Sequence, residues 1–140
     1  MTNWIRAQKP AGSPEKLGPL QLAWLGDAIW ELHQRLRHCS ISARSKDLHR
    51  AVVSEVKASA QAISLSALEP YLDDQEKMLV KKGRNKSRKG PRGADASTYG
   101  KATGFETMVG WLFLNNPERL AQLFDRLEES ESNTFKALKK

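Results

Sequence analysis

Residues 20–36 read LQLAWLGDAIWELHQRL. Drawn as a helix, this stretch carries apolar side chains around nearly its whole circumference. Gly18-Pro19 directly precede it, and proline is well suited to the first position of a helix. A helix that is apolar almost all round is typical of the buried centre of a domain. We therefore predict that residues 20–36 form a central helix around which the rest of the fold is built.

The rest of the chain also shows helical periodicity. Apolar residues at spacings of three and four predict helices at about 45–53, 54–68, 73–80 and 97–113, and Asn116-Pro117 opens a last one. No stretch alternates as a strand does, so the sequence predicts an all-α fold. With 140 residues, about one domain is expected. We expect an N-terminal arm (1–17), a domain (18–128) with a basic loop (81–96), and a tail or helix extension (129–140).

The composition indicates a soluble cytoplasmic protein and not a membrane or secreted one. Apolar residues make up 39% and charged residues 28% of the chain, as in ordinary soluble domains. The longest apolar run, Met108–Leu114, is far shorter than the roughly 20 residues of a membrane span. The N-terminus lacks the apolar core of a secretory signal. The single cysteine, Cys39, excludes an internal disulfide and a multi-cysteine zinc site.

Positive charge is concentrated in one segment. Residues 81–92, KKGRNKSRKGPR, contain seven basic residues and no acid, which accounts for the whole net charge of +7. Such a strip favours a polyanion as partner. Because the segment has no aromatic residue, contact with phosphates is more suitable than stacking on bases. The glycines and proline in the segment predict an irregular loop. The alternatives are a solvated loop without a partner and a nuclear-localisation tract.

Two acids lie on the two most apolar segments: Asp27 in LAWLGDAIWEL and Glu106 in ATGFETMVGWLFL. A carboxylate on a mostly buried helix is costly unless it is paired or binds a metal. Gly26 and Gly110 lie close to these acids, and a glycine within a helix usually has a packing reason. Two helices that cross at these glycines would bring both carboxylates to one point. Two carboxylates with water suit Mg²⁺ or Mn²⁺.

The residues alone leave alternatives open. Each acid could instead pair with a nearby arginine or lysine or reach solvent at a helix edge, and Glu31 has the same ambiguity. No Ser-His-Asp arrangement and no P-loop is present. The histidines form no metal-binding pattern and are expected at the surface or at helix ends: His33, His38 and His49.

The two acidic motifs resemble those of a known family. LAWLGDAIW is similar to the signature helix of ribonuclease III domains, and ATGFETMVGWLFL is similar to their second catalytic helix. KDLHRAVVSEVKASAQA and KKGRNKSRKG look like the middle helices and basic loop of Mini-ribonuclease III, a stand-alone form of this domain without a double-stranded-RNA-binding domain. The resemblance covers about residues 17–127.

The chain departs from full-length ribonuclease III enzymes at three acidic positions. Leu20 and Ala23 stand where those enzymes have further acids before the signature aspartate, and Thr103 replaces an aspartate three residues before the glutamate. Only Asp27 and Glu106 remain, which is also the Mini-ribonuclease III pattern. The resemblance implies that further metal ligands come from water and RNA.

The resemblance also implies the function. It implies an all-α homodimer that hydrolyses both strands of double-stranded RNA with Mg²⁺ (or Mn²⁺) and leaves 5′-phosphate and 3′-hydroxyl ends. The implied substrate is precursor large-subunit (23S) ribosomal RNA, with a ribosomal protein as a potential helper. Asp27 and Glu106 are then the catalytic and metal-binding residues. Lys101 could contact phosphate or simply face solvent. The candidate RNA-binding residues are Lys81, Lys82, Arg84, Asn85, Lys86, Arg88, Lys89 and Arg92.

Two other classes of function compete with the enzyme. The first is a non-catalytic RNA-binding or ribosome-assembly protein on the same fold, which the presence of both Asp27 and Glu106 disfavours. The second is a small helical DNA-binding protein. That class would need a basic recognition helix, whereas the basic charge here falls in a segment rich in glycine.

Overall fold

The computed structural model describes residues 14–39, 44–47, 49–50, 58–87 and 95–138, with side chains up to residue 131. These residues form helices and no strand, so the predicted all-α fold is confirmed. The elements are η1 (Pro14–Lys16), α2 (Pro19–His38), α4 (Ala58–Leu68), η2 (Glu69–Tyr71), α5 (Asp74–Lys86), α6 (Ala96–Asn115) and α7 (Pro117–Leu138). Among them, no helix combines the length and the hydropathy that crossing a membrane would need.

Some predicted segments lie partly outside the described residues. Of the helix predicted at 45–53, residues 45–47 and 49–50 are helical and residues 51–53 are not described. The start of the helix predicted at 54–68 and residues 1–13 of the expected arm are likewise outside the description.

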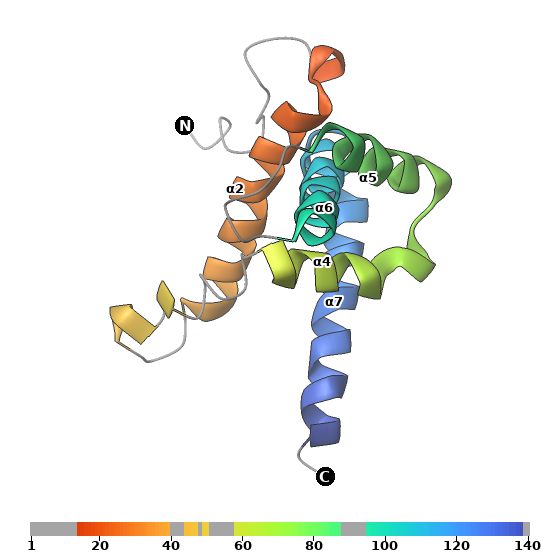
Figure 1. The fold of residues 1–140 in the computed structure, drawn as a ribbon. Helices are drawn as coiled ribbons and strands as arrows, with labels where there is room; N and C mark the ends of the chain where they lie inside the picture. Colours follow the sequence, from red (N-terminus) through yellow and green to blue (C-terminus); the bar gives the residue numbers. More distant parts are fainter. Residues whose placement is uncertain (1–13, 40–43, 48, 51–57, 88–94, 139–140) are drawn as a thin grey trace.

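The centre of the fold is α6 and not α2. In Figure 1, α6 is surrounded by α2, α4 and α5, while α7 leads away from the bundle. Phe105, Met108 and Val109 of α6 are fully buried and form the middle of the core. The prediction that residues 20–36 are the central helix was therefore wrong. Periodicity shows that a helix has apolar faces, but it does not show which helix the others surround.

The outer face of α2 is apolar and open to solvent. Trp24 is 83% exposed, Leu32 57% and Leu36 62%. Together with Leu20 and Ala28, which are also exposed, they recur at every fourth position and form one stripe along the helix. We call these five residues the α2 stripe. The opposite face, which includes Leu22, Gly26 and Trp30, is buried.

Two glycine contacts set how closely other helices approach α6. A Cβ on Gly26 would collide with the backbone carbonyl of Glu106, and a Cβ on Gly110 would collide with the backbone carbonyl of Leu22. The predicted crossing of the two acidic helices at Gly26 and Gly110 is thus confirmed. Because the contacts are to backbone atoms, no side-chain rotation could make room for a larger residue.

Helix α5 extends further than the sequence indicated. Asp73 caps its start by accepting a hydrogen bond from the backbone N–H of Glu76, and the helix continues to Lys86. The prediction of an irregular loop from residue 81 was therefore wrong for residues 81–86. Gly83 does not break the helix: it is buried where α5 packs on α6, and a Cβ there would collide with Thr107. Basic residues Arg88, Lys89 and Arg92 lie outside the described residues.

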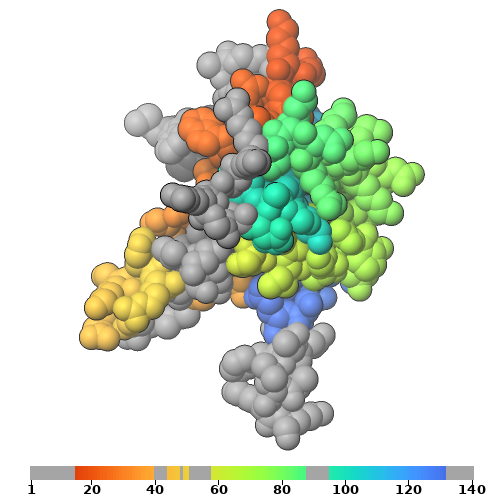
Figure 2. All heavy atoms as spheres, in the orientation of Figure 1, coloured from red at the N-terminus to blue at the C-terminus, as the bar shows by residue number. Residues whose placement is uncertain are grey.

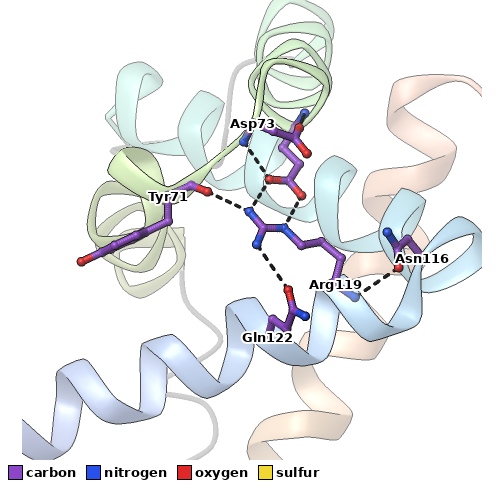
Figure 3. A network of polar contacts seen from close by, with 6 residues as sticks. Tyr71, Asp73, Asn116, Arg119 and Gln122 are labelled. Carbon is purple, nitrogen blue, oxygen red and sulfur yellow. Dashed lines mark hydrogen bonds and ion pairs between the residues drawn. The ribbon is translucent and has the colours of Figure 1, made fainter.

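An ion pair joins the start of α7 to the start of α5 (Figure 3). The Arg119 guanidinium donates hydrogen bonds to both Glu76 carboxylate oxygens, at 2.8 and 2.9 Å, and to the Tyr71 carbonyl oxygen at 2.7 Å. The side chain of Glu76 is only 2% exposed. Burial alone would raise the pKa of Glu76, but hydrogen bonds from Arg119 and from the Asp73 backbone N–H lower it below its usual value. Glu76 therefore stays ionised and paired at neutral pH.

We expect Arg119→Met to lower the free energy of unfolding by about 2–3 kcal/mol, because it leaves the buried Glu76 carboxylate without its partner. This loss is smaller than for a fully buried ion pair, because Arg119 is partly exposed. Urea denaturation at pH 7 measures the loss. Arg126→Met is the matched control, since Arg126 lies on the same helix and stacks on the exposed Tyr71 ring. Equal stability of wild type and Arg119→Met would show that the pair contributes nothing.

Candidate active site

The crossing of α2 and α6 places Asp27 and Glu106 side by side. Gly26 lies against the backbone of Glu106, so the residue that follows it on α2 projects toward the same point as Glu106 on α6. The two carboxyl groups are linked by a hydrogen bond. Asp27 is exposed and Glu106 is partly buried. The two acids predicted to meet are therefore together, at the edge of the core.

Both acids line one cavity of about 380 Å³. Its other walls come from α2 (Leu20, Ala23 and Trp24) and α6 (Tyr99 and Thr103). Leu20, Ala23 and Thr103 are the three positions at which the sequence lacks further acids. The cavity thus keeps two carboxylates in otherwise neutral walls, and it is open enough to admit a ligand.

The environment of Glu106 favours its protonated form. Burial, followed by the charge of Asp27 and the hydrogen bond to Asp27, raises the pKa of Glu106 to about 8. A hydrogen bond from Gln61 acts in the opposite direction. Near neutral pH and without a cation, Glu106 accordingly carries a proton.

This arrangement predicts a stability that depends on pH. The pKa of Glu106 is higher in the folded protein than in the unfolded chain, so without metal the folded state is favoured below about pH 4.5 and loses stability as the pH rises toward 8. In EDTA, we expect the melting temperature of Glu106→Gln to exceed that of the wild type at pH 8.5 by several degrees, and the gap to shrink at pH 5. Scanning calorimetry at the two pH values tests this. A gap independent of pH would contradict it.

The donor set fits a hard divalent cation. Two adjacent carboxylates that repel each other when both are ionised gain most from a cation between them, and Mg²⁺ is commonly held by one or two carboxylates together with water and substrate phosphates. Within the described part of the chain, no group of three or more His, Cys, Asp or Glu side chains is arranged to hold a metal ion. Asp27 and Glu106 would be the two protein ligands.

Sequence reasoning missed a third polar residue at this site. Gln61, on α4, is 2% exposed and hydrogen-bonds to Glu106. The available signal was a glutamine between Ala60 and Ala62 in a helix that is otherwise alanine, serine and large apolar residues. That signal alone does not reveal a partner more than forty residues away in the sequence.

Glu31, the other acid considered in the sequence, and His33 both have structural partners. Glu31 forms a surface ion pair with Arg35 at 2.8 Å, one turn along α2. The His33 ring stacks on Phe124, with the ring centroids 4.4 Å apart, and its Nε2 lies 3.3 Å from a Glu128 carboxylate oxygen. Both observations favour the structural alternatives over a role in the acidic cavity.

The basic segment passes the acidic cavity at Ser87. Ser87 ends α5, and its hydroxyl lies 3.5 Å from that of Thr103, a residue of the cavity wall. Of the predicted RNA-binding residues, the described ones are all exposed: Lys81, Lys82, Arg84, Asn85 and Lys86. Figure 2 shows α5 beside the first turns of α6 on the face toward the viewer. Three of these residues, Lys81, Arg84 and Asn85, also line a second cavity of about 740 Å³ against α4.

Several known proteins are similar to this chain in sequence or in fold. The model of the ribonuclease III domain matches residues 20–117. A Mini-ribonuclease 3 of a Synechococcus species is 40% identical over 126 residues, which cover 90% of this chain and 91% of the relative. One from Symbiobacterium thermophilum is 43% identical over 114 residues, covering 79% and 88%. A crystal structure of a Fusobacterium nucleatum protein has a TM-score of 0.75 and 27% identity, and the match covers 83% of this chain and 95% of that one.

Proposed function

Because the chain belongs to the ribonuclease III family of endoribonucleases, and within it to the Mini-ribonuclease 3 group, we propose that it uses Mg²⁺ to cut both strands of double-stranded RNA. The observation that carries the proposal is the pairing of Asp27 and Glu106 in one open cavity. A binding-only protein would have no need to keep two mutually repelling acids at this point.

The residues of the cavity divide the chemistry between them. A bound divalent cation supplies positive charge that stabilises the charge developing on the phosphate and activates water. Asp27 and Glu106 would hold that cation, and the neutral walls would leave room for phosphate oxygens as further ligands. In the proposed hydrolysis, the water oxygen bonds to phosphorus, the bond from phosphorus to the 3′ oxygen breaks, and a proton passes to that oxygen. The products carry 5′-phosphate and 3′-hydroxyl ends.

A cleavage assay on a long generic RNA duplex tests the proposal. We expect cutting by the wild type with Mg²⁺ or Mn²⁺ and none with EDTA. A duplex that is bound but not cut, under any metal, would contradict the proposal. Precursor large-subunit ribosomal RNA, with and without ribosomal proteins, is the second substrate, because we propose that it is the natural one. A role on that substrate would place the enzyme in the cytoplasm.

We propose that the basic segment grips the duplex, since Ser87 in its middle contacts the wall of the acidic cavity and its described basic side chains are exposed. Neutralising Lys82, Arg84, Lys86 and Arg88 to glutamine should weaken duplex binding and reduce the slope of log K against log salt. The reduction expected from counterion release is about 0.7–0.9 for each phosphate that the variant no longer neutralises. Fluorescence anisotropy in EDTA, at several salt concentrations, measures the slope.

The control for this variant removes four exposed basic residues elsewhere and so changes the net charge equally. The chain offers Lys16, Arg35, Lys46 and Arg50. A general effect of net charge would change both variants alike. If the two variants show the same slope of log K against log salt, the proposed contact between the basic segment and the duplex is contradicted.

We propose that the enzyme is a homodimer that buries the α2 stripe. Five apolar residues in one exposed line are unusual for a surface that stays in water, and its end near Leu20 and Trp24 lies at the acidic cavity. A second copy on this stripe would extend the cavity into a longer site for a duplex. Sedimentation should show a dimer at micromolar concentration for the wild type and a monomer for Leu32→Glu. A wild-type monomer would contradict the proposal.

A further inference from the structure

The buried face of α4 contains one polar residue. Gln61, Ala62, Leu65 and Leu68 are the buried residues of this helix, and the apolar members of the set pack toward the core. A buried side-chain amide costs free energy unless it is hydrogen-bonded. At this position, therefore, a methionine or leucine would be expected if packing against α6 were the only requirement.

The partner of Gln61 is the acid at the centre of the site. Its side-chain amide forms a hydrogen bond with the Glu106 carboxylate. Because the amide N–H donates and the carboxylate oxygen accepts, this contact fixes the position of that oxygen and favours the ionised form, which is the form that binds a cation. Asp27 meets Glu106 from α2 and Gln61 meets it from α4, so the Glu106 carboxyl group is held from two helices.

Building on the proposed function, we propose that Gln61 is a positioning residue, whose amide holds the Glu106 carboxylate in the orientation in which it shares a divalent cation with Asp27. Residues that hydrogen-bond to metal ligands set the orientation of those ligands, and their loss typically lowers metal affinity or activity about 10–100-fold. The position of Gln61 outside the lining of the cavity agrees with an effect through Glu106 and not on RNA directly.

The decisive variant is Gln61→Met, which keeps the length and volume of the side chain but removes the donor. We expect its dissociation constant for Mn²⁺, measured without RNA from the electron paramagnetic resonance signal of free Mn²⁺, to rise about tenfold or more. Duplex binding in EDTA should stay at the wild-type level. The Mn²⁺ concentration for half-maximal cleavage should rise by the same factor, with cleavage partly recovered at saturating Mn²⁺.

The matched control is Gln34→Met. Gln34 is also a buried glutamine, at 1% exposure, but its side-chain oxygen accepts a hydrogen bond from Arg37, away from the cavity. A purely structural role for buried glutamines predicts lower stability in both variants and unchanged Mn²⁺ affinity in both. Gln61→Asn, which keeps an amide but shortens the side chain by one methylene, replaces Gln61→Met if that variant does not fold.

The outcomes separate this inference from the proposed function. Wild-type Mn²⁺ affinity in folded Gln61→Met, or in Gln61→Asn if it is the variant used, overturns the positioning role, while loss of cleavage in Glu106→Gln still supports the metal site. If the wild type itself does not bind Mn²⁺, or if Glu106→Gln binds it equally well, the proposed metal site is wrong and the role of Gln61 is lost with it.

Discussion

Glu106→Gln is expected to lower the rate of duplex cleavage by at least about 1,000-fold, while RNA binding changes little. The substitution keeps the shape of the side chain but removes one of the two carboxylates that we propose to hold the cation, and with it the charge that the transition state requires. Asp27→Asn should have an effect of similar size. Single-turnover cleavage at saturating enzyme measures the chemical step, and anisotropy in EDTA measures binding.

Glu31→Gln is the control for these two variants. Glu31 lies on the same helix as Asp27, one turn further on, but it pairs with Arg35 at the surface. Its loss should change cleavage less than about twofold, as for an ordinary exposed ion pair. Near-normal turnover in Glu106→Gln or Asp27→Asn would show that the residue concerned is not a metal ligand.

Gly110→Ala is expected to cost about 3 kcal/mol or more in the free energy of unfolding and to reduce cleavage in the fraction that folds. The added methyl group would collide with the backbone carbonyl of Leu22, so α2 and α6 would have to move apart. That movement would also separate Asp27 from Glu106. Chemical denaturation gives the stability, and Mn²⁺ titration of the folded protein reports on the acid pair.

Gly100→Ala tests the same chemical change on the same helix. Among the described residues, a Cβ at Gly100 would meet only the Arg84 side chain, at 3.4 Å, so alanine should be tolerated and can gain up to about 1 kcal/mol from helix propensity. The explanation by close helix contact would fail if the two alanine variants were equally stable.

The acid pair could be predicted from the sequence because the signals for it are local, although the contact itself joins two helices. Gly26 and Gly110 each lie within a turn of an acid on an apolar helix, and close packing of two such helices brings the acids together. The start of α7 at Asn116-Pro117 and the buried residues Leu120 and Leu123 could be predicted for the same reason. Capping and periodicity are properties of short stretches of chain.

Other features depend on which helices meet but have no comparable local signal, and these could not be predicted. As a glycine in a basic stretch, Gly83 indicates a helix break, whereas its cost within α5 is offset because only glycine fits against Thr107 of α6. The apolar circumference of α2 indicates a central helix, but Trp24 is largely exposed since α6 occupies the centre. The contact of Gln61 with Glu106 joins α4 to α6, and no pattern of residue spacing in the sequence indicates it.

The proton that Glu106 carries has a consequence for the order of events on the enzyme. Because Glu106 carries this proton, it adds no negative charge to the cavity, so an approaching RNA duplex meets less repulsion there before a cation is present. A cation held by Asp27 and Glu106 would displace that proton into solvent. Metal loading would then be an exchange of a proton for a divalent ion, and mild acid should oppose catalysis by competing for the Glu106 carboxylate.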